Sequence, residues 1–321
     1  MKLVSLLAAA LLLPAFHCLA QDYPSNPIRV IVPFAPGAST DSLTRTVAQR
    51  LQQNMNASFV VENQAGASGF VGIGNVARAA ANGYTLGIAS PSTHSIAAAL
   101  HKKMPYDPIR DFTLISTLAK YISVLVVNPQ VPATTMKEFI AYAKSNPDKL
   151  SFASAGTGSS THLLGEMFKQ AAQVSMVHVP FKGGGQGLQD LVGGYVPVAV
   201  ISIAGVDSLI KSGKLRALAV FERERYAEFP NVPSIVEEVP GMNPRISWFG
   251  ILGPAGMPPA VTARLNAEVL KVLRTPEIRQ RLEAIGFQML GSSPQEFADL
   301  IRDDIVAWTK IAAAAGIKAD D

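Results

Sequence analysis

From Ile28 onward, short apolar runs alternate with stretches of helical periodicity. This alternation is the pattern of βαβ units, in which helices cover a parallel sheet. The first helical stretch aligns Leu43, Val47 and Leu51 on one stripe, as a helix packed on a sheet requires. The strands expected in this part are 28–34, 59–62 and 84–89, and the helices are 39–55 and one that ends near residue 81. We therefore expect one open α/β sheet here.

Residues 115–128 are rich in β-forming residues and too long for an ordinary strand of about five or six residues. A strand that leaves one sheet and enters another would have this length. A second alternating set follows, with strands expected at 150–153, 176–179, 196–201 and 215–221 and helices at 136–145, 159–172 and 187–193. The apolar run SWFGILGP could return to the first sheet, before three helices that open with proline and span 258–274, 276–285 and 294–315.

These patterns predict an α/β protein of two lobes, each an open sheet with helices on both faces, joined by two crossing strands that serve as a hinge. We expect lobe 1 to comprise residues 21–121 with 246–321, and lobe 2 to comprise residues 122–245. Open α/β sheets bind ligands beyond the carboxyl ends of their strands, at helix N-termini. A ligand site is therefore expected in the cleft between the lobes.

The first 20 residues have the pattern of a secretory signal peptide, with a positive start at Lys2 and an unbroken apolar run over 3–16. That run is shorter than the roughly 20 residues a spanning helix needs. We expect residues 1–20 to be removed and the mature chain to be periplasmic. Cys18 is the one cysteine, so its removal excludes disulfides and a thiolate nucleophile. The net charge of +4 comes without a Lys/Arg cluster, so nucleic acid is not an expected partner.

Three predicted strand-to-helix turns share one composition, rich in glycine, serine and threonine. They are PFAPGASTD at 33–41, SPSTHS at 90–95 and ASAGTGSSTH at 153–162. Glycine lets the backbone approach a ligand, and the free N–H groups and partial positive charge of a helix start attract anions without a lysine. Serine and threonine here are also ordinary helix N-caps. Each turn alone is open to both interpretations, whereas turns from both lobes facing one cleft favour an anion site.

Several titratable residues lie in or near these loops. Asp41 is expected to interact with the helix dipole, to order its loop or to bind a ligand ammonium group, and Arg45 is its expected i+4 partner. His94 and His162 close two of the turns and would either line the cleft or serve as capping and core residues. Lys182, in PFKGGGQG, either reaches the cleft or is solvated.

Catalytic and cofactor motifs are incomplete in this sequence. His162 lies beside Ser159 and Ser160, but a triad base is normally distant in sequence from its serine, and no GxSxG elbow occurs. The mature histidines include no i,i+4 pair that would hold a metal. GIGNVA matches a dinucleotide fingerprint weakly, because the preceding strand ends ten residues upstream. We therefore expect no enzyme activity, no metal and no cofactor.

Over nearly the whole mature chain the sequence resembles the Bug family, the TctC-like substrate-binding receptors of tripartite tricarboxylate transporters. The segments that carry the resemblance are YPSNPIRVIVPFAPGASTD, VVENQAGASGFVGIGNVARAAANGYTL, MPYDPIRDF, FASAGTGSSTHL, HVPFKGG, GKLRALAV and WFGILGPAGMP, in the family's order. Two departures are Ala38, where a second glycine is common, and Ala81-Asn82, where Pro-Asp is usual. Ala38 narrows the first loop slightly.

The resemblance implies a type II periplasmic-binding-protein fold that closes on a small organic acid and then docks on a membrane permease. It implies that the loops at 34–41 and 156–162 hold the acid. Together with the turn composition it gives the expected ligand-binding residues, which are Phe34, Ala35, Pro36, Gly37, Ala38, Ser39, Thr40, Asp41, Ser90, Ser92, Thr93, His94, Ser154, Gly156, Thr157, Gly158, Ser159, Ser160, Thr161, His162 and Lys182.

The expected partners are a small carboxylate ligand and, transiently, the permease subunits of a tripartite transporter, and we expect the protein to be a monomer. Two alternatives remain open at this point. One is a periplasmic sensor that presents its ligand to a membrane signalling protein, and the other is a periplasmic hydrolase that uses Ser159 and His162. The sequence does not identify the carboxylate, although the scarcity of charged side chains beside the turns favours one or two carboxylates over citrate.

Overall fold

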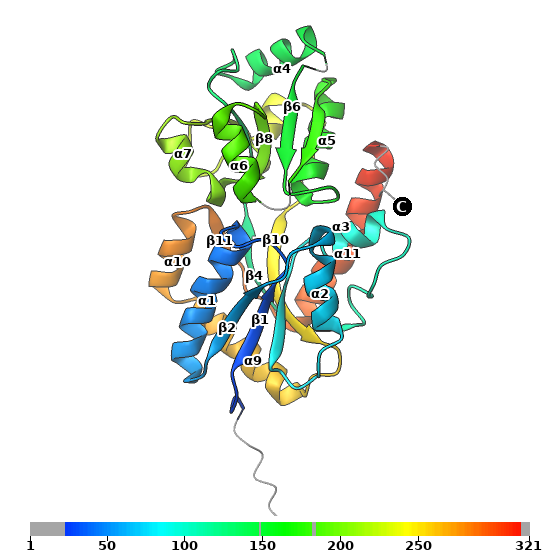
Figure 1. Ribbon diagram of the computed structural model, residues 1–321, viewed down its shortest axis with the longest axis vertical. Coiled ribbons are helices and arrows are strands. Elements are labelled where there is room, and N and C mark those ends of the chain that lie inside the picture. Colours follow the sequence, from blue (N-terminus) through cyan, green and yellow to red (C-terminus); the bar gives the residue numbers. More distant parts are fainter. Residues whose placement is uncertain (1–22, 148, 182–183, 316–321) are drawn as a thin grey trace, which may run out of the picture.

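The computed structural model describes residues 23–147, 149–181 and 184–315. The chain forms two α/β lobes, one above the other in Figure 1, each built around its own sheet. The predicted two-lobed α/β architecture is therefore confirmed. Among the described residues, no helix combines the length and apolar character that a membrane span needs. The signal peptide expected at 1–20 lies outside the described residues.

The first lobe contains a six-stranded sheet. Its strands are β1 (Ile28–Val32), β2 (Phe59–Asn63), β3 (Thr85–Ala89), β4 (Phe112–Tyr121), β10 (Ser247–Pro254) and β11 (Phe287–Met289). Its helices are α1 (Ser39–Met55), α2 (Phe70–Ala77), α3 (Ser95–Leu100), α9 (Pro259–Leu273), α10 (Pro276–Glu283) and α11 (Pro294–Ala315), with a 3-10 turn η1 (Ala67–Gly69) before α2. The strand order is β11-β4-β10-β3-β1-β2.

The second lobe contains a five-stranded sheet. Its strands are β5 (Ser123–Val127), β6 (Ser151–Ser154), β7 (Val177–Pro180), β8 (Val198–Ser202) and β9 (Arg216–Val220). Its helices are α4 (Met136–Ser145), α5 (Ser160–Ala172), α6 (Gly184–Gly193), α7 (Asp207–Lys211) and α8 (Ile235–Glu238), with a 3-10 turn η2 (Ile203–Gly205) after β8. The strand order is β7-β6-β8-β5-β9.

The chain passes from the first sheet to the second almost without interruption. Tyr121 ends β4 opposite Ser247 of the first sheet, and Ser123 begins β5 opposite Ser202 of the second. The predicted long β stretch therefore does divide between two sheets. The return differs from the expected crossing strand, because β10 lies wholly in the first sheet and the turn-rich segment after β9 makes the connection.

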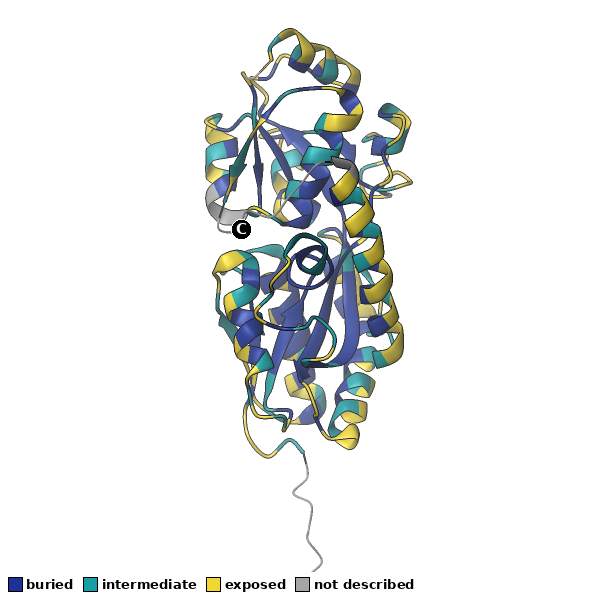
Figure 2. Ribbon diagram, turned by 90° about the vertical axis from the view of Figure 1, so that its right-hand side faces the viewer, coloured by how far each residue is buried: buried dark blue, intermediate teal, exposed yellow. Residues whose placement is uncertain are grey.

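Each sheet is buried by its own apolar clusters, and Figure 2 shows the strands of both lobes as mostly buried. All eight residues of β10 are buried, as expected for a strand between β3 and β4 that is covered on both faces. The predicted stripe of Leu43, Val47 and Leu51 on α1 packs into the first core. Burial of each such side chain stabilises the fold by about 1.5–3 kcal/mol.

The C-terminal helix α11 belongs to both lobes, and Figure 1 shows it beside their junction. Phe297 packs with Trp248 in a first-lobe cluster, with the two rings edge to face at 5.3 Å. Further along the same helix, Trp308 is fully buried in the second-lobe cluster with Ile96 and Phe168. The single helix α11 thus contributes buried side chains to the cores of both lobes.

A buried carboxylate fixes α11 in this position. Asp304 is 1% exposed and accepts hydrogen bonds from Trp248 Nε1 at 2.8 Å, from Arg245 Nη2 at 2.7 Å and from Ser95 Oγ at 3.4 Å. A buried charge is tolerated only where it is paired and hydrogen-bonded in this way. The network therefore ties α11 to β10, to the return segment before it and to α3.

Most expected elements are present, and the differences lie in short pieces. The helices expected at 39–55, 136–145 and 294–315 have those ends, whereas the helix expected to end near residue 81 ends at Ala77. Elements α7, α8 and β11 were not predicted. Each has five residues or fewer, so periodicity has too little length to show, and neighbouring elements decide its conformation.

The close packing of β10 against α11 gives a stability prediction. A Cβ added at Gly250 would overlap the Phe297 ring, so we expect Gly250→Ala to lower the free energy of unfolding by about 1–3 kcal/mol, the usual cost of overpacking. Gly205→Ala is the matched control, because nothing lies within 4 Å of its added Cβ. Denaturant titration of both variants is the measurement, and equal midpoints for the two would contradict the packing argument.

Candidate functional site

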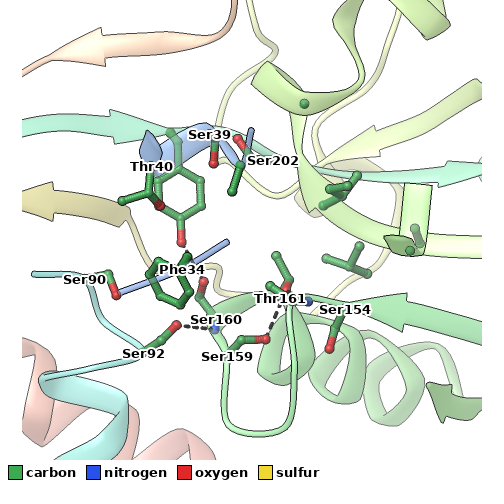
Figure 3. Close-up of a pocket in the computed structure, with 18 of the residues that line it drawn as sticks. Phe34, Ser39, Thr40, Ser90, Ser92, Ser154, Ser159, Ser160, Thr161 and Ser202 are labelled. Carbon is green, nitrogen blue, oxygen red and sulfur yellow. Dashed lines mark hydrogen bonds between the residues drawn. The ribbon is translucent and has the colours of Figure 1, made fainter. Parts of the chain in front are cut away.

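The three turns singled out in the sequence meet at one pocket between the two sheets, shown in Figure 3. The first follows β1 and opens α1, the second follows β3 and opens α3, and the third follows β6 and opens α5. The expected residues that line the pocket are Phe34, Gly37, Ala38, Ser39, Thr40, Ser90, Ser92, Ser154, Ser159, Ser160 and Thr161. The pocket has a cavity volume of about 120 Å³, which suits a small molecule.

An equal share of the lining comes from residues that were not among the expected ligand-binding residues. They are Tyr121, Ala153, Ala155, Gly187, Leu188, Ala199, Val200, Ile201, Ser202, Gly205 and Phe249. Most are apolar strand residues, which look like core residues in a sequence. The sequence could have indicated these residues only through their positions near the strand ends that face the other lobe. Recognising those ends requires knowledge of the strand order.

Several expected residues lie near the pocket without lining it. They are Ala35, Pro36, Asp41, Thr93, His94, Gly156, Thr157, Gly158 and His162. Lys182 lies outside the described residues. The roles of these side chains follow from their hydrogen bonds, and for most of them that role is to shape the loops.

Asp41 orders the first loop. Its carboxylate is 5% exposed and accepts hydrogen bonds from the Gly37 N–H, from Asn63 Nδ2 and from Arg45 Nε, each at 3.0 Å. Burial alone would raise the pKa of Asp41, but these hydrogen bonds and the Arg45 charge outweigh it and hold the pKa below its ordinary value. Asp41 is therefore ionised and satisfied within the protein, and the predicted pairing with Arg45 is confirmed.

Helix α1 opens into the pocket without a side-chain cap. Its N-cap is Ala38, which makes no capping hydrogen bond, while Ser39 and Thr40 of its first turn line the pocket. The first N–H groups of a helix have no acceptor within the helix. The interpretation of this turn as an ordinary serine or threonine cap is therefore wrong, and the uncapped first turn of α1 lies at the pocket.

Helix α5 approaches the same pocket from the other lobe. Its N-cap Ser159 accepts a hydrogen bond from the His162 N–H, so here the capping interpretation is correct. The Ser160 N–H donates to Ser92 Oγ of the first lobe at 3.3 Å, as the dashed line in Figure 3 marks. The positive ends of two long helices, from different lobes, thus converge on one cavity.

Tyr121 and Phe249 form an aromatic part of the pocket wall. Their rings are stacked with centroids 4.5 Å apart, and both line the pocket. Tyr121 lies where β4 ends at the lobe junction, and its hydroxyl is 2.7 Å from Ser160 Oγ of α5. Burial raises the pKa of the Tyr121 phenol, so it keeps its proton.

Ser202 is a pocket-lining residue whose hydroxyl group has an unsatisfied hydrogen bond. It is 8% exposed, it lines the pocket at the end of β8, and its Oγ is buried with no hydrogen-bond partner among the described residues. Ser123, opposite it on β5, has a similarly buried and unpartnered Oγ but does not line the pocket. A buried hydroxyl without a partner costs about 1–3 kcal/mol, so Ser202 is a pocket-lining residue with an unmet hydrogen bond.

None of the described residues that line the pocket carries a charge. Across the described part of the chain, no three His, Cys, Asp or Glu side chains gather as metal ligands would. Polarity in the pocket therefore comes from hydroxyl groups and backbone dipoles, set among apolar strand residues.

A strained turn of the first lobe touches the loop that opens α5. Gly66, Ala67, Ser68 and Gly69 all have positive φ, which is uncommon for Ala67 (φ 44°) and Ser68 (φ 53°) because they carry a Cβ. Ser68 Oγ donates a hydrogen bond to the Thr157 carbonyl of the second lobe at 2.8 Å. This turn, which is part of the segment VVENQAGASGFVGIGNVARAAANGYTL, thus forms an inter-lobe contact. Thr157 takes part in that contact and does not line the pocket.

Comparison with known proteins places the chain in a family. Residues 43–317 match the family model of the tripartite tricarboxylate transporter family receptor, TctC. The chain belongs to this family. One TctC-family relative is BugT of Bordetella pertussis, 33% identical over 300 residues that cover 93% of this chain and 92% of BugT.

Solved structures agree with the TctC-family assignment. The chain is similar to R. palustris Rpa4515 with adipate, at 34% identity and a TM-score of 0.90, over 92% of this chain and 99% of that one. It is also similar to MatC from Rhodopseudomonas palustris with bound malate, at 31% identity and a TM-score of 0.85, over 90% and 99% of the two chains. The resemblance to Bug receptors is confirmed, and so is the prediction of a substrate-binding receptor rather than an enzyme.

Buried His94 gives a prediction about pH. Its side chain is fully buried beside Tyr106 and Phe112, and burial lowers its pKa to about 3. Below a pH of about 6.5, His94 binds a proton in the unfolded chain but not in the folded chain. The contribution of His94 to stability is therefore complete above that pH and is lost progressively as the pH falls toward 3.

We therefore expect His94→Phe to reduce the dependence of the unfolding free energy on pH between pH 4.5 and 6. The reduction should reach about 1.4 kcal/mol per pH unit, which corresponds to one proton. Denaturant titrations of the wild type and the variant at several pH values measure it. The same slope in both proteins would show that His94 does not titrate on unfolding.

Proposed function

We propose that this protein captures a small organic acid, with one or two carboxylates, in the pocket between its lobes. In this proposal it acts in the periplasm and delivers the acid to a tripartite tricarboxylate-type membrane transporter. The observation that carries the proposal is the uncapped start of α1, which opens into a pocket that has no charged side chain among its described lining residues.

An anion suits such a pocket better than a cation or a neutral molecule. The N–H groups of a helix start and the partial positive charge of the helix attract carboxylates. Ser39, Thr40 and Ser202 add hydroxyl donors. A carboxylate oxygen accepts several hydrogen bonds, so it can satisfy these donors together.

The apolar part of the wall suits a hydrocarbon body. Tyr121 and Phe249 stack beside the pocket, and Leu188, Ala199 and Val200 contribute further apolar atoms. Rpa4515 is described with adipate and MatC with malate, and both ligands are dicarboxylates. A ligand with charged ends and a small carbon skeleton is therefore the class to test first.

Closure of the two lobes on the ligand is the proposed mechanism. The pocket takes residues from both lobes, so a bound acid contacts more of its donors when the lobes are together. A ligand shifts an open–closed equilibrium only through its stronger binding to the closed form. The closed form would then be the one that the membrane permease recognises.

The test is a thermal-shift panel on residues 21–321, stripped of any co-purified ligand, with malate, succinate, adipate, benzoate, citrate, amino acids and phosphate. A ligand at 100 times its dissociation constant adds about 2.7 kcal/mol, which raises the midpoint by several degrees. We expect selective shifts with mono- or dicarboxylates, followed up by calorimetry. Shifts with amino acids or phosphate alone, or a tight response to citrate alone, would overturn this substrate class.

Ser202 separates ligand binding from folding. Replacing it with alanine removes a hydroxyl that lacks a partner, so we expect Ser202→Ala to leave the ligand-free protein as stable or slightly more stable. The same change should weaken carboxylate binding about tenfold, because a hydrogen bond to a charged group is lost. Stability is measured by denaturant titration and affinity by calorimetry.

Ser123→Ala is the matched control, because Ser123 is buried and unpartnered on the neighbouring strand but does not line the pocket. It should leave the affinity unchanged. Equal affinities for Ser202→Ala and the wild type would remove this hydroxyl from the ligand contacts.

A further inference from the structure

We propose that the stacked pair His162 and His178 positions the loop between β6 and α5 for ligand binding, with each histidine holding one end of the loop. Neither residue lines the pocket, so both are positioning residues rather than ligand contacts. The inference rests on the proposed function, since it concerns the same site. His178 was not among the residues expected from the sequence.

His178 holds the start of the loop. It lies on β7, beside β6, and its Nε2 is 2.7 Å from Ser154 Oγ, which lines the pocket. Ser154 Oγ also accepts a hydrogen bond from the Gly156 N–H at 3.1 Å. The imidazole therefore fixes both the direction of a pocket hydroxyl and, through it, the first turn of the loop.

His162 holds the end of the same loop. It lies in the first turn of α5, and its Nδ1 accepts a hydrogen bond from the Gly158 N–H at 3.2 Å. The two imidazole rings are stacked with centroids 3.9 Å apart and planes inclined by 19°. Each ring thus packs against the other, and this contact links the two ends of the loop.

The loop needs such a support because its own backbone supplies little. Gly156 and Gly158 both have positive φ, at 122° and 74°, and glycine has the largest conformational freedom of any residue. Ser159, which follows, is the cap of α5, and Ser160 and Thr161 line the pocket. Any shift of the loop would move these groups away from the ligand.

The hydrogen bond at Gly158 requires a lone pair on His162 Nδ1, so that ring must be neutral at this nitrogen. The charged groups around the pair are Glu166, with Oε1 4.0 Å from His162 Nε2, and Lys169, which pairs with Glu166 at 2.8 Å. Burial, His162 and Lys169 lower the pKa of His178 to about 3. His178 is therefore neutral at neutral pH, as its hydrogen bond with Ser154 Oγ allows.

Amide substitutions test the pair with matched controls. The side-chain oxygen of asparagine lies near the position of a histidine Nδ1, and that of glutamine lies near the position of Nε2. We expect His162→Asn and His178→Gln to bind adipate or malate within about twofold of the wild type. His162→Gln and His178→Asn should bind about tenfold more weakly. Each pair of variants loses the same ring and differs by one methylene group, so general effects of losing the stack are shared.

A second readout needs no ligand. Amide hydrogen exchange of Gly158, measured by NMR on the ligand-free protein, should be slow in the wild type and in His162→Asn and faster in His162→Gln. Equal exchange in the two variants would overturn the positioning role, and so would unequal exchange with unchanged affinity. A wild type that binds no carboxylate would overturn the proposed function instead. In that case, unequal exchange of Gly158 in the two variants would still show that His162 holds the loop. Equal exchange would overturn that role of His162.

Discussion

The passage of one nearly continuous strand between two sheets determines where everything else in this protein lies. Because β4 ends at the junction and β10 is antiparallel to both β4 and β3, the parallel strands β1, β2 and β3 also end there. Because β5 begins at the junction and β8 runs against it, β8 and its parallel neighbours β6 and β7 end there too. The loops that open α1, α3 and α5 must therefore face one another across the cleft.

The pocket formed in this way uses dipoles in place of charges. A buried ammonium or guanidinium group left without its counter-ion would cost several kcal/mol, so it would oppose emptying of the pocket. Helix N–H groups and hydroxyls cost much less when water replaces the ligand. The one carboxylate in the first loop, Asp41, is already satisfied by Arg45, Asn63 and Gly37. It orders the backbone of the first loop and does not itself line the pocket.

Local pattern was enough to predict the long elements and the three turns, because helical periodicity over α1 or α11 and the Gly/Ser/Thr composition of the turns are local properties. It could not predict the apolar half of the pocket. Ala199 and Val200 look like any buried strand residue, and their role follows from the register of β8 against β5. The roles of His94 and Asp41 also depended on tertiary burial, which decides whether a polar residue in a turn faces a ligand or the core.

Sharing of α11 between the lobes has a consequence for dissecting the protein. A fragment that contains only residues 122–245 would have all five strands of the second sheet but would lack Ile96 and Trp308, which belong to its core. Removal of a buried tryptophan typically costs 3–5 kcal/mol, a large part of the stability of a small domain. We therefore expect the continuous middle segment to be markedly less stable on its own, because the last helix of the chain completes its core.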